Sequence, residues 1–315
     1  MTDSTPDVRI VIPAFNDHKK LVACLESIYA SSSAAPGVVV VDDASSDDTA
    51  AEVRRRFPLC ELLVHAQNLG FGATCNTGLR VALDRGADLV LLLNQDTVVA
   101  PSMIERLVRF LQATPAAGVV GPRTRSTRRT QDGRDRLLYA GAWRTRLPLR
   151  QHIPGIERID AAESRPPVRV DYVWGHGMML RASVLREVGL FDTDFPMYYE
   201  DMDLCHRVRQ AGHELWCQPA ALMWHDVADG ARASESEYWR WALKVFSMTV
   251  FHRKHYGRWK AVLLNSLTVA AEARQLVCHG HLRAARHLIT AALRPAVGFR
   301  RTPRRLGAQA QRGAR

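Results

Sequence analysis

Short apolar runs alternate with amphipathic segments through the first 115 residues of the chain. Each run is bounded by polar residues and is too short for a helix core, which predicts a strand buried on both faces. The segments between the runs carry apolar residues at helical spacing. The predicted strands cover residues 8–12, 38–41, 59–65 and 89–93, and the predicted helices cover residues 18–30, 50–57 and 73–85. This repeat is typical of an α/β fold, a mostly parallel sheet with right-handed crossovers and helices on both faces.

Polar residues follow the carboxyl ends of all four strands, at Asn16, Asp43, Asn68 and Asp96. Because the carboxyl ends of parallel strands meet at one edge of a sheet, these residues predict a binding crevice there. Asp96 is suited to hold a divalent cation, and a cation can hold a diphosphate. The alternative is that residues 94–97 form only a polar turn leading into the next helix.

The pattern changes after residue 122. Residues 123–167 are rich in Arg, Thr and Pro and have little periodicity, which predicts a mobile, basic loop region with a short hairpin. Further strands are predicted near residues 169–172, 178–180, 214–217 and 221–225, with helices over residues 182–188 and 200–211. From about residue 236 the chain is helical to near residue 294. We therefore expect an α/β domain over residues 1–235 and a C-terminal helical extension over residues 236–315.

Asp201 lies in the first turn of the predicted helix 200–211, three residues before Leu204 on its buried stripe. Desolvation would raise the pKa of Asp201, and the helix N-terminus would lower it. A carboxylate in that position can act as a general base. The alternative is an acid that only stabilises the helix, with Arg207 and Arg209 matching it at the other end.

Three weaker features lie elsewhere in the chain. Asp43 is suited to accept hydrogen bonds from a ribose hydroxyl or a base imide, or else to cap the next helix. The glycines of residues 67–72 would let backbone approach a ligand closely, although Cys75 stands where a dinucleotide fingerprint needs its third Gly. His225 ends a strand, and it could complete a metal shell if Asp96 already holds the cation.

The chain of 315 residues has the composition of a soluble globular protein, but its net charge is +11. After Glu272 there is no acidic residue and there are ten Arg. Such a tail could bind nucleic acid, anionic lipid or another acidic partner, or be a solvated end. The six Cys form no C-x-x-C pair, there is no signal peptide, and no apolar run is long enough to span a membrane. These features favour a cytoplasmic protein with reduced thiols.

Five motifs stand in order between Val8 and Asp226. They are Val-Ile-Pro-Ala-Phe-Asn (11–16), Val-Asp-Asp-Ala-Ser (41–45), Asn-Leu-Gly-Phe-Gly (68–72) with Asn76, Leu-Leu-Asn-Gln-Asp-Thr (92–97) and Glu-Asp-Met-Asp-Leu (200–204). Together they resemble the family 2 glycosyltransferases, which have the GT-A fold. Residues 177–215 are most similar to bacterial rhamnosyltransferase-type members.

The resemblance implies a role for each candidate residue. The nucleotide-sugar donor would be bound by Pro13, Ala14, Phe15, Asn16, Asp43, Asn68, Gly72, Asn76, Asn94 and Gln95. Residues 94–96 would be the D-x-D equivalent, in which Asp96 binds Mg²⁺ or Mn²⁺ with His225 as a second ligand. Asp201 would be the base that deprotonates the acceptor hydroxyl. The acceptor would be framed by Trp174, Gly175, His176, Tyr199 and Glu200.

The implied activity is an inverting transfer of a sugar, rhamnose from dTDP-rhamnose, to a hydroxyl of a glycan or lipid-linked acceptor in cell-surface polysaccharide synthesis. Residues 1–122 would be the donor half of the catalytic domain and residues 123–235 the acceptor half. Asn94 stands where the first acid of D-x-D is expected, so metal binding would rest largely on Asp96. The processive Q-x-x-R-W motif is absent, since Glu237 precedes Arg240-Trp241, and this favours a non-processive enzyme.

Two questions about partners stay open. The alternative to an enzyme is a non-catalytic nucleotide-sugar-binding homologue that acts as a partner subunit. The amphipathic C-terminal helices and the basic end that follows them could rest on an anionic membrane at the inner face. The alternative is a helical cap on the catalytic domain with a disordered basic end. No recognition module for nucleic acid accompanies the tail, so nucleic acid is not an expected partner.

Overall fold

The computed structural model describes residues 5–31, 37–129, 135–144, 151–152, 166–226, 236–278 and 280–293. The basic end beyond residue 293 and most of the predicted loop region between residues 130 and 165 lie outside the described residues, so the predictions for them remain predictions.

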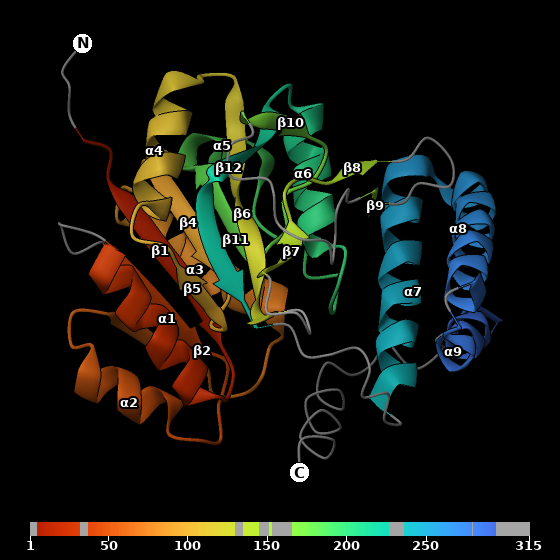
Figure 1. Cartoon of the computed structure of the whole chain (residues 1–315), viewed down its shortest axis with the longest axis horizontal. Coiled ribbons are helices and arrows are strands. Elements are labelled where there is room, and N and C mark those ends of the chain that lie inside the picture. The colour runs from red at the N-terminus through yellow and green to blue at the C-terminus, as the bar shows by residue number, and fades with distance from the viewer. Residues whose placement is uncertain are drawn as a thin grey trace.

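The first half of the chain alternates strands and helices as predicted (Figure 1). Its elements are β1 (Val8–Ala14), α1 (His18–Ser31), β2 (Gly37–Asp42), α2 (Thr49–Arg56), β3 (Glu61–Val64), α3 (Phe71–Asp84) and β4 (Leu89–Leu93). The four strands pair in parallel, with β1 between β2 and β4 and with β3 next to β2. Their carboxyl ends therefore meet at one edge.

The second half extends the same sheet with strands of both directions. Its elements are β5 (Thr97–Val99), α4 (Met103–Ala113), β6 (Ala117–Arg129), β7 (Asp135–Tyr139), β8 (Trp143–Arg144), β9 (Gln151–His152), β10 (Val168–Val170), β11 (Gly177–Arg181), α5 (Ala182–Val188), α6 (Glu200–Gln210) and β12 (Glu214–His225). The strand order is β10-β12-β6-β11-β4-β1-β2-β3. Because β11 runs antiparallel to both β4 and β6, the complete sheet is mixed.

The region after residue 122 differs from the prediction. Residues 123–129 were expected in a loop, but they continue β6, and Arg123 to Ser126 pair with the end of β12. Arg123 is 1% exposed and Thr124 is fully buried. The loop prediction was wrong here because this strand buries polar side chains, and polar composition hides the strand pattern. The predicted hairpin is confirmed by the antiparallel pairing of β6 with β7.

Helices cover both faces of the sheet. Ile10 and Ile12 of β1 pack in the core under α1 and α4, whereas Val11 packs in the core under α3 and α6. This alternation follows from the two-residue period of a strand. Helix α3 lies very close to β1, since a Cβ built on Gly78 would meet Val11 Cγ1 at 2.4 Å. The close packing holds the loop before α3 at the carboxyl edge of the sheet.

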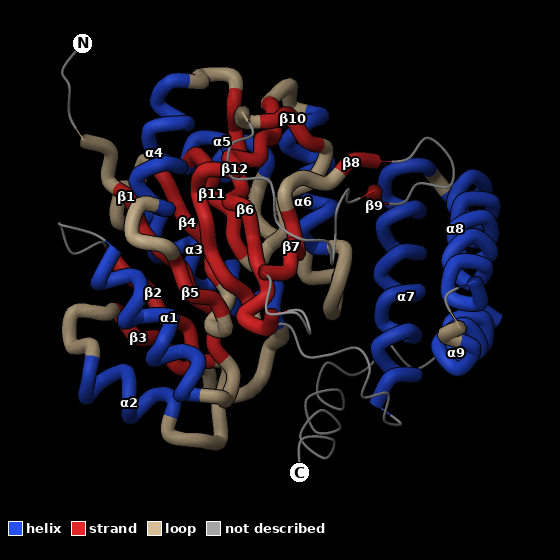
Figure 2. The backbone as a smooth tube through the Cα atoms, in the orientation of Figure 1, coloured by secondary structure: helices blue, strands red, loops and turns tan. Residues whose placement is uncertain are grey.

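The predicted C-terminal helices form a bundle of α7 (Ser236–Tyr256), α8 (Arg258–Cys278) and α9 (Leu282–Leu293). Figures 1 and 2 show α7 facing the sheet, with α8 and α9 on its far side. Within the described residues, no helix is long and apolar enough to cross a membrane. Strand β6 runs across residue 122, so the two expected halves share one sheet. The division of the chain at residue 235 stays a prediction.

Candidate active site

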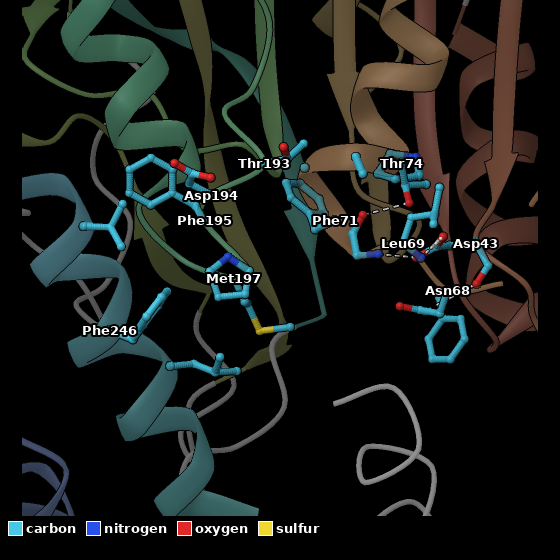
Figure 3. Close-up of a pocket in the computed structure, with 18 of the residues that line it drawn as sticks. Asp43, Asn68, Leu69, Phe71, Thr74, Thr193, Asp194, Phe195, Met197 and Phe246 are labelled. Atoms are coloured by element: carbon cyan, nitrogen blue, oxygen red, sulfur yellow. Dashed lines mark hydrogen bonds between the residues drawn. The ribbon is translucent and has the colours of Figure 1, made fainter. Parts of the chain in front are cut away.

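A cavity of about 1080 Å³ lies at the carboxyl edge of the parallel strands. One wall comes from the ends of β1, β2 and β4 and the loop before α3. The other comes from residues 193–197 and helix α7. Figure 3 shows Asp43 and Asn68 across the cavity from Met197 and Phe246. The predicted donor and metal residues that line it are Pro13, Ala14, Phe15, Asp43, Asn68, Gly72, Asn94, Gln95 and Asp96.

Gln95 joins two of the motifs. Its side-chain oxygen accepts a hydrogen bond from the Phe15 backbone N–H at 2.9 Å, and its amide nitrogen donates to the carbonyls of Phe15 and Asn16 at 3.1 and 3.0 Å. Asn16 in turn accepts a hydrogen bond from the Ser46 backbone N–H at 2.9 Å. The amide of Gln95 therefore fixes the loop after β1 against the end of β4, and Asn16 itself does not line the cavity.

Asp43 organises the glycine loop. Its carboxylate accepts hydrogen bonds from the backbone N–H groups of Leu69 and Gly70 at 2.8 and 2.9 Å, and it lies 2.8 Å from Nδ1 of His65. Gly70 has φ +87°, a conformation that favours glycine. Asp43 thus faces the cavity while it holds the loop that forms the adjoining wall.

Asn76 lies deeper in the fold than its predicted role requires. The side chain is buried, and both ends of its amide are hydrogen-bonded to the backbone of Phe191, at 2.8 and 2.9 Å. Asn76 therefore ties α3 to the segment that leads to the opposite wall, and it does not line the cavity.

Asp96 and His225 lie together, as the resemblance implied. The antiparallel pairing of β12 with β5 places His225 opposite Thr97, and Nε2 of His225 lies 3.0 Å from Oδ1 of Asp96. Two ligands of one octahedral cation, each about 2.1 Å from it and at right angles, are about 3 Å apart. The pair can therefore accept a divalent cation with little movement.

Asn94 adds a second observation that fits a cation. Its side-chain oxygen is buried and has no hydrogen-bond partner among the described residues, although Asn94 lines the cavity. Buried polar atoms are normally satisfied, so a ligand or an ion is a natural partner for this oxygen. Within the described residues no group of three His, Cys, Asp or Glu side chains could hold a metal. An ion at Asp96 and His225 would therefore need further oxygens, such as those of a diphosphate.

His176 and Trp174, which were expected to contact the acceptor, pack instead beside the Asp96–His225 pair. The rings of His176 and His225 stack with centroids 4.7 Å apart, and Trp174 packs 5.3 Å from His176. Burial lowers the pKa of His176 well below its usual value, so its ring is neutral. The backbone carbonyl of His176 also accepts a hydrogen bond from the Asn94 N–H at 3.1 Å. Neither residue lines the cavity.

Asp201 sits at the start of α6 beside the cavity wall. Its carboxylate accepts hydrogen bonds from the backbone N–H groups of Gly175 and Met202 at 3.0 and 2.8 Å. Burial raises the pKa of Asp201, and these hydrogen bonds oppose the rise. A Cβ on Gly175 would lie 3.5 Å from Asp201 and 3.7 Å from the ring of Phe71, which lines the cavity. Asp201 is thus one layer behind the wall.

Glu200 and Tyr199 are buried next to Asp201. Burial, together with the charge of Asp201, raises the pKa of Glu200 to about 8. Tyr199 has φ +68°, as does Tyr198, and such a conformation costs energy for an aromatic residue. Its ring packs 5.7 Å from Phe251 of α7. Tyr199 therefore joins the start of α6 to α7, and neither Tyr199 nor Glu200 lines the cavity.

The wall formed by α7 was not predicted. It contributes apolar residues, one threonine and cations: Leu243, Phe246, Thr249, Val250, Arg253 and Lys254, with Arg258 at the start of α8. The stripe Leu243, Phe246 and Val250 is visible in the sequence at helical spacing, and the cations follow it directly. That pattern was assigned to the helical extension, because spacing along one helix does not reveal which surface the helix faces.

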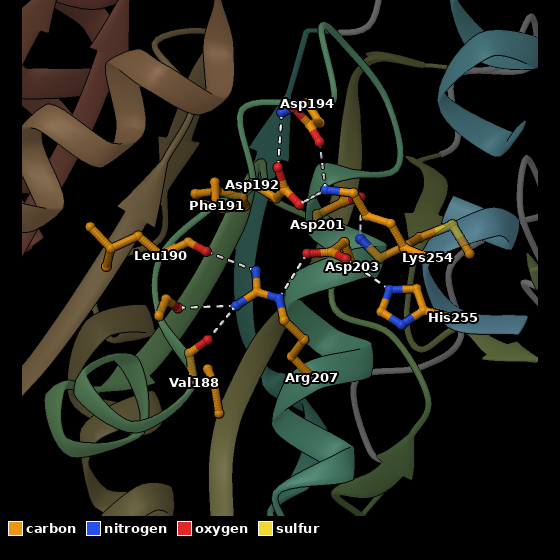
Figure 4. A network of polar contacts seen from close by, with 12 residues as sticks. Val188, Leu190, Phe191, Asp192, Asp194, Asp201, Asp203, Arg207, Lys254 and His255 are labelled. Atoms are coloured by element: carbon orange, nitrogen blue, oxygen red, sulfur yellow. Dashed lines mark hydrogen bonds and ion pairs between the residues drawn. The ribbon is translucent and has the colours of Figure 1, made fainter. Parts of the chain in front are cut away.

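A polar network locks this wall in place (Figure 4). Asp203 of α6 pairs with Arg207 and with His255 of α7, each at 2.8 Å. Arg207 also donates to the carbonyls of Val188 and Leu190 at 2.6 and 2.7 Å. Lys254 pairs with Asp192 and, at 2.9 Å, with Asp194. Helix α7 is therefore held against both α6 and the loop that carries residues 193–197.

Comparison with known proteins identifies the family. The model of glycosyl transferase family 2 matches residues 9–189. The N-acetylglucosaminyl-diphospho-decaprenol L-rhamnosyltransferase of Mycobacterium tuberculosis is 28% identical over 226 residues, which are 66% of this chain and 72% of the relative. The dTDP-rhamnosyl transferase RfbF of Shigella flexneri is 24% identical over 169 residues, which are 53% of this chain and 52% of the relative.

Two solved structures share the fold. The mannosyltransferase PcManGT from Pyrobaculum calidifontis, in complex with GDP-Man and Mn²⁺, has a TM-score of 0.56 at 18% identity and covers 92% of this chain and 87% of its own. GalNAc-T7, with UDP, GalNAc and Mn²⁺, has a TM-score of 0.57 at 14% identity and covers 79% of this chain and 51% of its own. The predicted GT-A fold is confirmed, and with a family model that matches more than half of its residues the chain belongs to glycosyl transferase family 2.

Proposed function

We propose that the protein is an inverting, non-processive glycosyltransferase that moves rhamnose from dTDP-rhamnose to a hydroxyl of a glycan or lipid-linked acceptor in cell-surface polysaccharide synthesis. The observation that carries the proposal is one cavity that Asp96 lines, with His225 in contact with Asp96 and the partly buried carboxylate of Asp201 behind the wall. The two rhamnosyltransferase relatives support the choice of sugar.

On the donor side, the loop after β1 and the glycine loop would hold the nucleotide, with Asp43 fixing the glycine loop. Asp96 and His225 would hold Mg²⁺ or Mn²⁺, with the oxygen of Asn94 beside it. A divalent cation bound there would neutralise charge on the diphosphate leaving group. The neutral ring of His176 keeps that of His225 in place by stacking on it.

Asp201 would act as the base. Its carboxylate would take the proton of the acceptor hydroxyl while the hydroxyl oxygen bonds to the anomeric carbon. The bond from that carbon to the diphosphate oxygen breaks on the opposite side, so the configuration inverts. The elevated pKa of Asp201 suits this role, because an ordinary aspartate is a weak base. The hydrogen bonds from Gly175 and Met202 fix the direction of its carboxylate.

The acceptor would enter along the wall made by α7. Leu243, Phe246 and Val250 give this wall an apolar surface, and Arg253 and Arg258 add exposed cations. Neither arginine has an ion pair among the described residues. An apolar surface that ends in two guanidinium groups suits an amphiphilic phosphate. We propose a lipid-linked, phosphate-bearing acceptor, and the diphospho-decaprenol in the name of the mycobacterial relative supports this choice. The catalytic unit of residues 1–235 would thus work together with the helical extension.

A non-catalytic subunit that only binds nucleotide-sugar is the second candidate. One observation favours it, since Asp201 does not line the cavity and backbone N–H groups occupy both its oxygens. Catalysis would therefore require the region of Gly175 and Phe71 to open when the acceptor binds. The two candidates differ in whether replacing Asp201 changes transfer.

The test is transfer by the purified full chain from dTDP-rhamnose, UDP-glucose and GDP-mannose, with Mn²⁺ or with a chelator. Asp201→Asn should lower the transfer rate by a factor of about 10² to 10⁴ and leave dTDP affinity unchanged. Asp88→Asn is the matched control, because this exposed acid lies before β4, at the opposite end of the strand from Asp96. If Asp201→Asn still transfers sugar at the unaltered rate, Asp201 is not the catalytic base. If the unaltered chain binds dTDP but transfers no sugar, the result supports the non-catalytic subunit instead.

A further inference from the structure

The outer face of α8 is apolar and exposed. Trp259, Val262, Leu263 and Leu267 are 91%, 64%, 60% and 39% exposed. Their spacing of three, four and eight residues from Trp259 places them on one side of the helix. We name these four residues the α8 face. The opposite side of α8 carries Ala261, Leu264 and Thr268, which are buried against the bundle. The face is therefore a second apolar surface of α8, left over after the bundle has packed.

The surroundings of the α8 face are cationic. Arg258, Lys260 and Arg274 are exposed on the same helix. Residues 258–293 contain a single acid, Glu272, whose carboxylate is paired with Lys244 at 3.1 Å. A helix with bulky apolar residues on one face and cations around them is the pattern of a helix that lies in a membrane interface. An exposed Trp suits the headgroup level of a bilayer, where one end of the ring is wet.

A second copy of the chain is a poorer occupant. In a two-fold symmetric contact each patch faces its own copy. The α8 face would then bring Arg258, Lys260 and Arg274 of one copy toward the same cations of the other, and like charges repel. An anionic bilayer would attract these cations instead of repelling them, because each Lys or Arg near its surface adds favourable electrostatic energy. Charge therefore favours lipid over self-association.

We propose that the α8 face docks the protein on an anionic lipid bilayer, with the four apolar side chains in the interface and the cations on the headgroups. Arg258 joins the face to the cavity, since it lines the cavity and directly precedes Trp259. Docking by this face would therefore bring Arg258, at the α8 end of the cavity wall, close to the membrane surface. The sequence placed membrane contact in the C-terminal helical pair and the basic end that follows it, and the proposal narrows that contact to the outer face of α8.

The test is sedimentation of the full chain with vesicles of equal parts phosphatidylcholine and phosphatidylglycerol, and with vesicles of phosphatidylcholine alone. We expect binding to the anionic vesicles that weakens in high salt. The double variant Trp259→Ser/Leu263→Ser should weaken it by at least about tenfold, because each side chain loses a buried apolar contact with lipid. Leu59→Ser is the matched control, since Leu59 is 76% exposed in the loop after α2, a helix that Figure 1 shows across the molecule from α8.

Each result decides the proposal. Unchanged binding by the double variant would show that another part of the chain holds the membrane and would overturn it. So would a failure of the unaltered chain to bind, or a self-association that the double variant abolishes, which would make the face a dimer contact. Equal melting temperatures of the variants exclude misfolding as the cause of weaker binding. No donor or acceptor is present in this experiment, so its outcome is independent of the glycosyltransferase assay.

Discussion

The imidazole of His225 meets the carboxylate of Asp96 because β12 ends antiparallel to β5. Their atoms Nε2 and Oδ1 are 3.0 Å apart, and the backbone N–H of Asp226 donates to the carbonyl of Asp96 at 3.0 Å. The side-chain contact and the backbone hydrogen bond together hold the end of β12 against the residues that follow β4. The candidate cation site is thus made by two segments that only the sheet brings together.

Replacing His225 should weaken metal binding at this pair. We expect His225→Gln to raise the Mn²⁺ concentration needed for half-maximal dTDP binding by about 10- to 100-fold, because one of two protein ligands is lost. Calorimetric titration of dTDP at several Mn²⁺ concentrations measures it. His213→Gln is the control, since His213 pairs with Glu187 elsewhere on the surface. An unchanged Mn²⁺ requirement would make the Asp96–His225 contact an ordinary ion pair.

Glu200 should make stability depend on pH. Its pKa is about 8 in the folded chain and near the ordinary value of 4.5 when unfolded, so the folded state binds the additional proton between these values. The contribution of this proton to the free energy of unfolding is fully present below pH 4.5, and it is lost as the pH rises toward 8. The melting temperature of Glu200→Gln should therefore exceed that of the unaltered chain at pH 8 to 9, and the difference should shrink toward pH 5.

The measurement is thermal unfolding of both proteins across that pH range. Glu187→Gln is the control, because Glu187 is an exposed acid whose contact with His213 lies outside this buried pair. A melting-temperature difference between Glu200→Gln and the unaltered chain that stays constant with pH would contradict a raised pKa at Glu200.

Gly78 should be intolerant of any side chain. In Gly78→Ala the added Cβ would meet Val11 Cγ1 at 2.4 Å and Val41 Cγ2 at 3.1 Å. Overpacking of this kind costs about 1–3 kcal/mol in the free energy of unfolding. Chemical denaturation measures that loss. Gly72→Ala is the comparison on the same helix, since its Cβ would lie 3.7 Å from Cβ of Phe191, an ordinary contact distance. Equal losses in the two variants would refute the close packing of α3 on β1.

The strands and their polar ends could be predicted because they depend on local pattern. The run 89–93 is apolar on both faces, and its polar end supplies Asn94 and Asp96 to the cavity. The direction of individual side chains could not be predicted. The amide of Gln95 binds the backbone of Phe15 and Asn16, which are near it only after β1 and β4 pair.

The acceptor side was harder to predict for the same reason. Trp174 and His176 are polar-tipped aromatics next to a strand, a pattern that suits a binding site, yet they pack against each other and Tyr139. The α7 wall depends on contacts such as Asp203 with His255, between residues distant in the chain. No periodicity along a single segment reports such a contact.

The two arginines of the α7 wall supply the sharpest test of the acceptor site. Arg253 and Arg258 lie on either side of the turn at Gly257, and both line the cavity. A charge-assisted hydrogen bond to phosphate contributes about 1.5–3 kcal/mol, so Arg253→Gln or Arg258→Gln should raise KM for a diphosphate-linked lipid acceptor by about tenfold or more. The affinity for dTDP should stay unchanged, because in the proposed site the opposite wall of the cavity holds the donor.

The assay uses N-acetylglucosaminyl-diphospho-decaprenol in detergent, so that docking on a bilayer does not affect the result. Arg283→Gln is the control, because Arg283 is an exposed arginine of α9. If dTDP affinity instead falls by the same factor as acceptor KM rises, the arginines hold the donor diphosphate and the acceptor must approach from the side of Asp201.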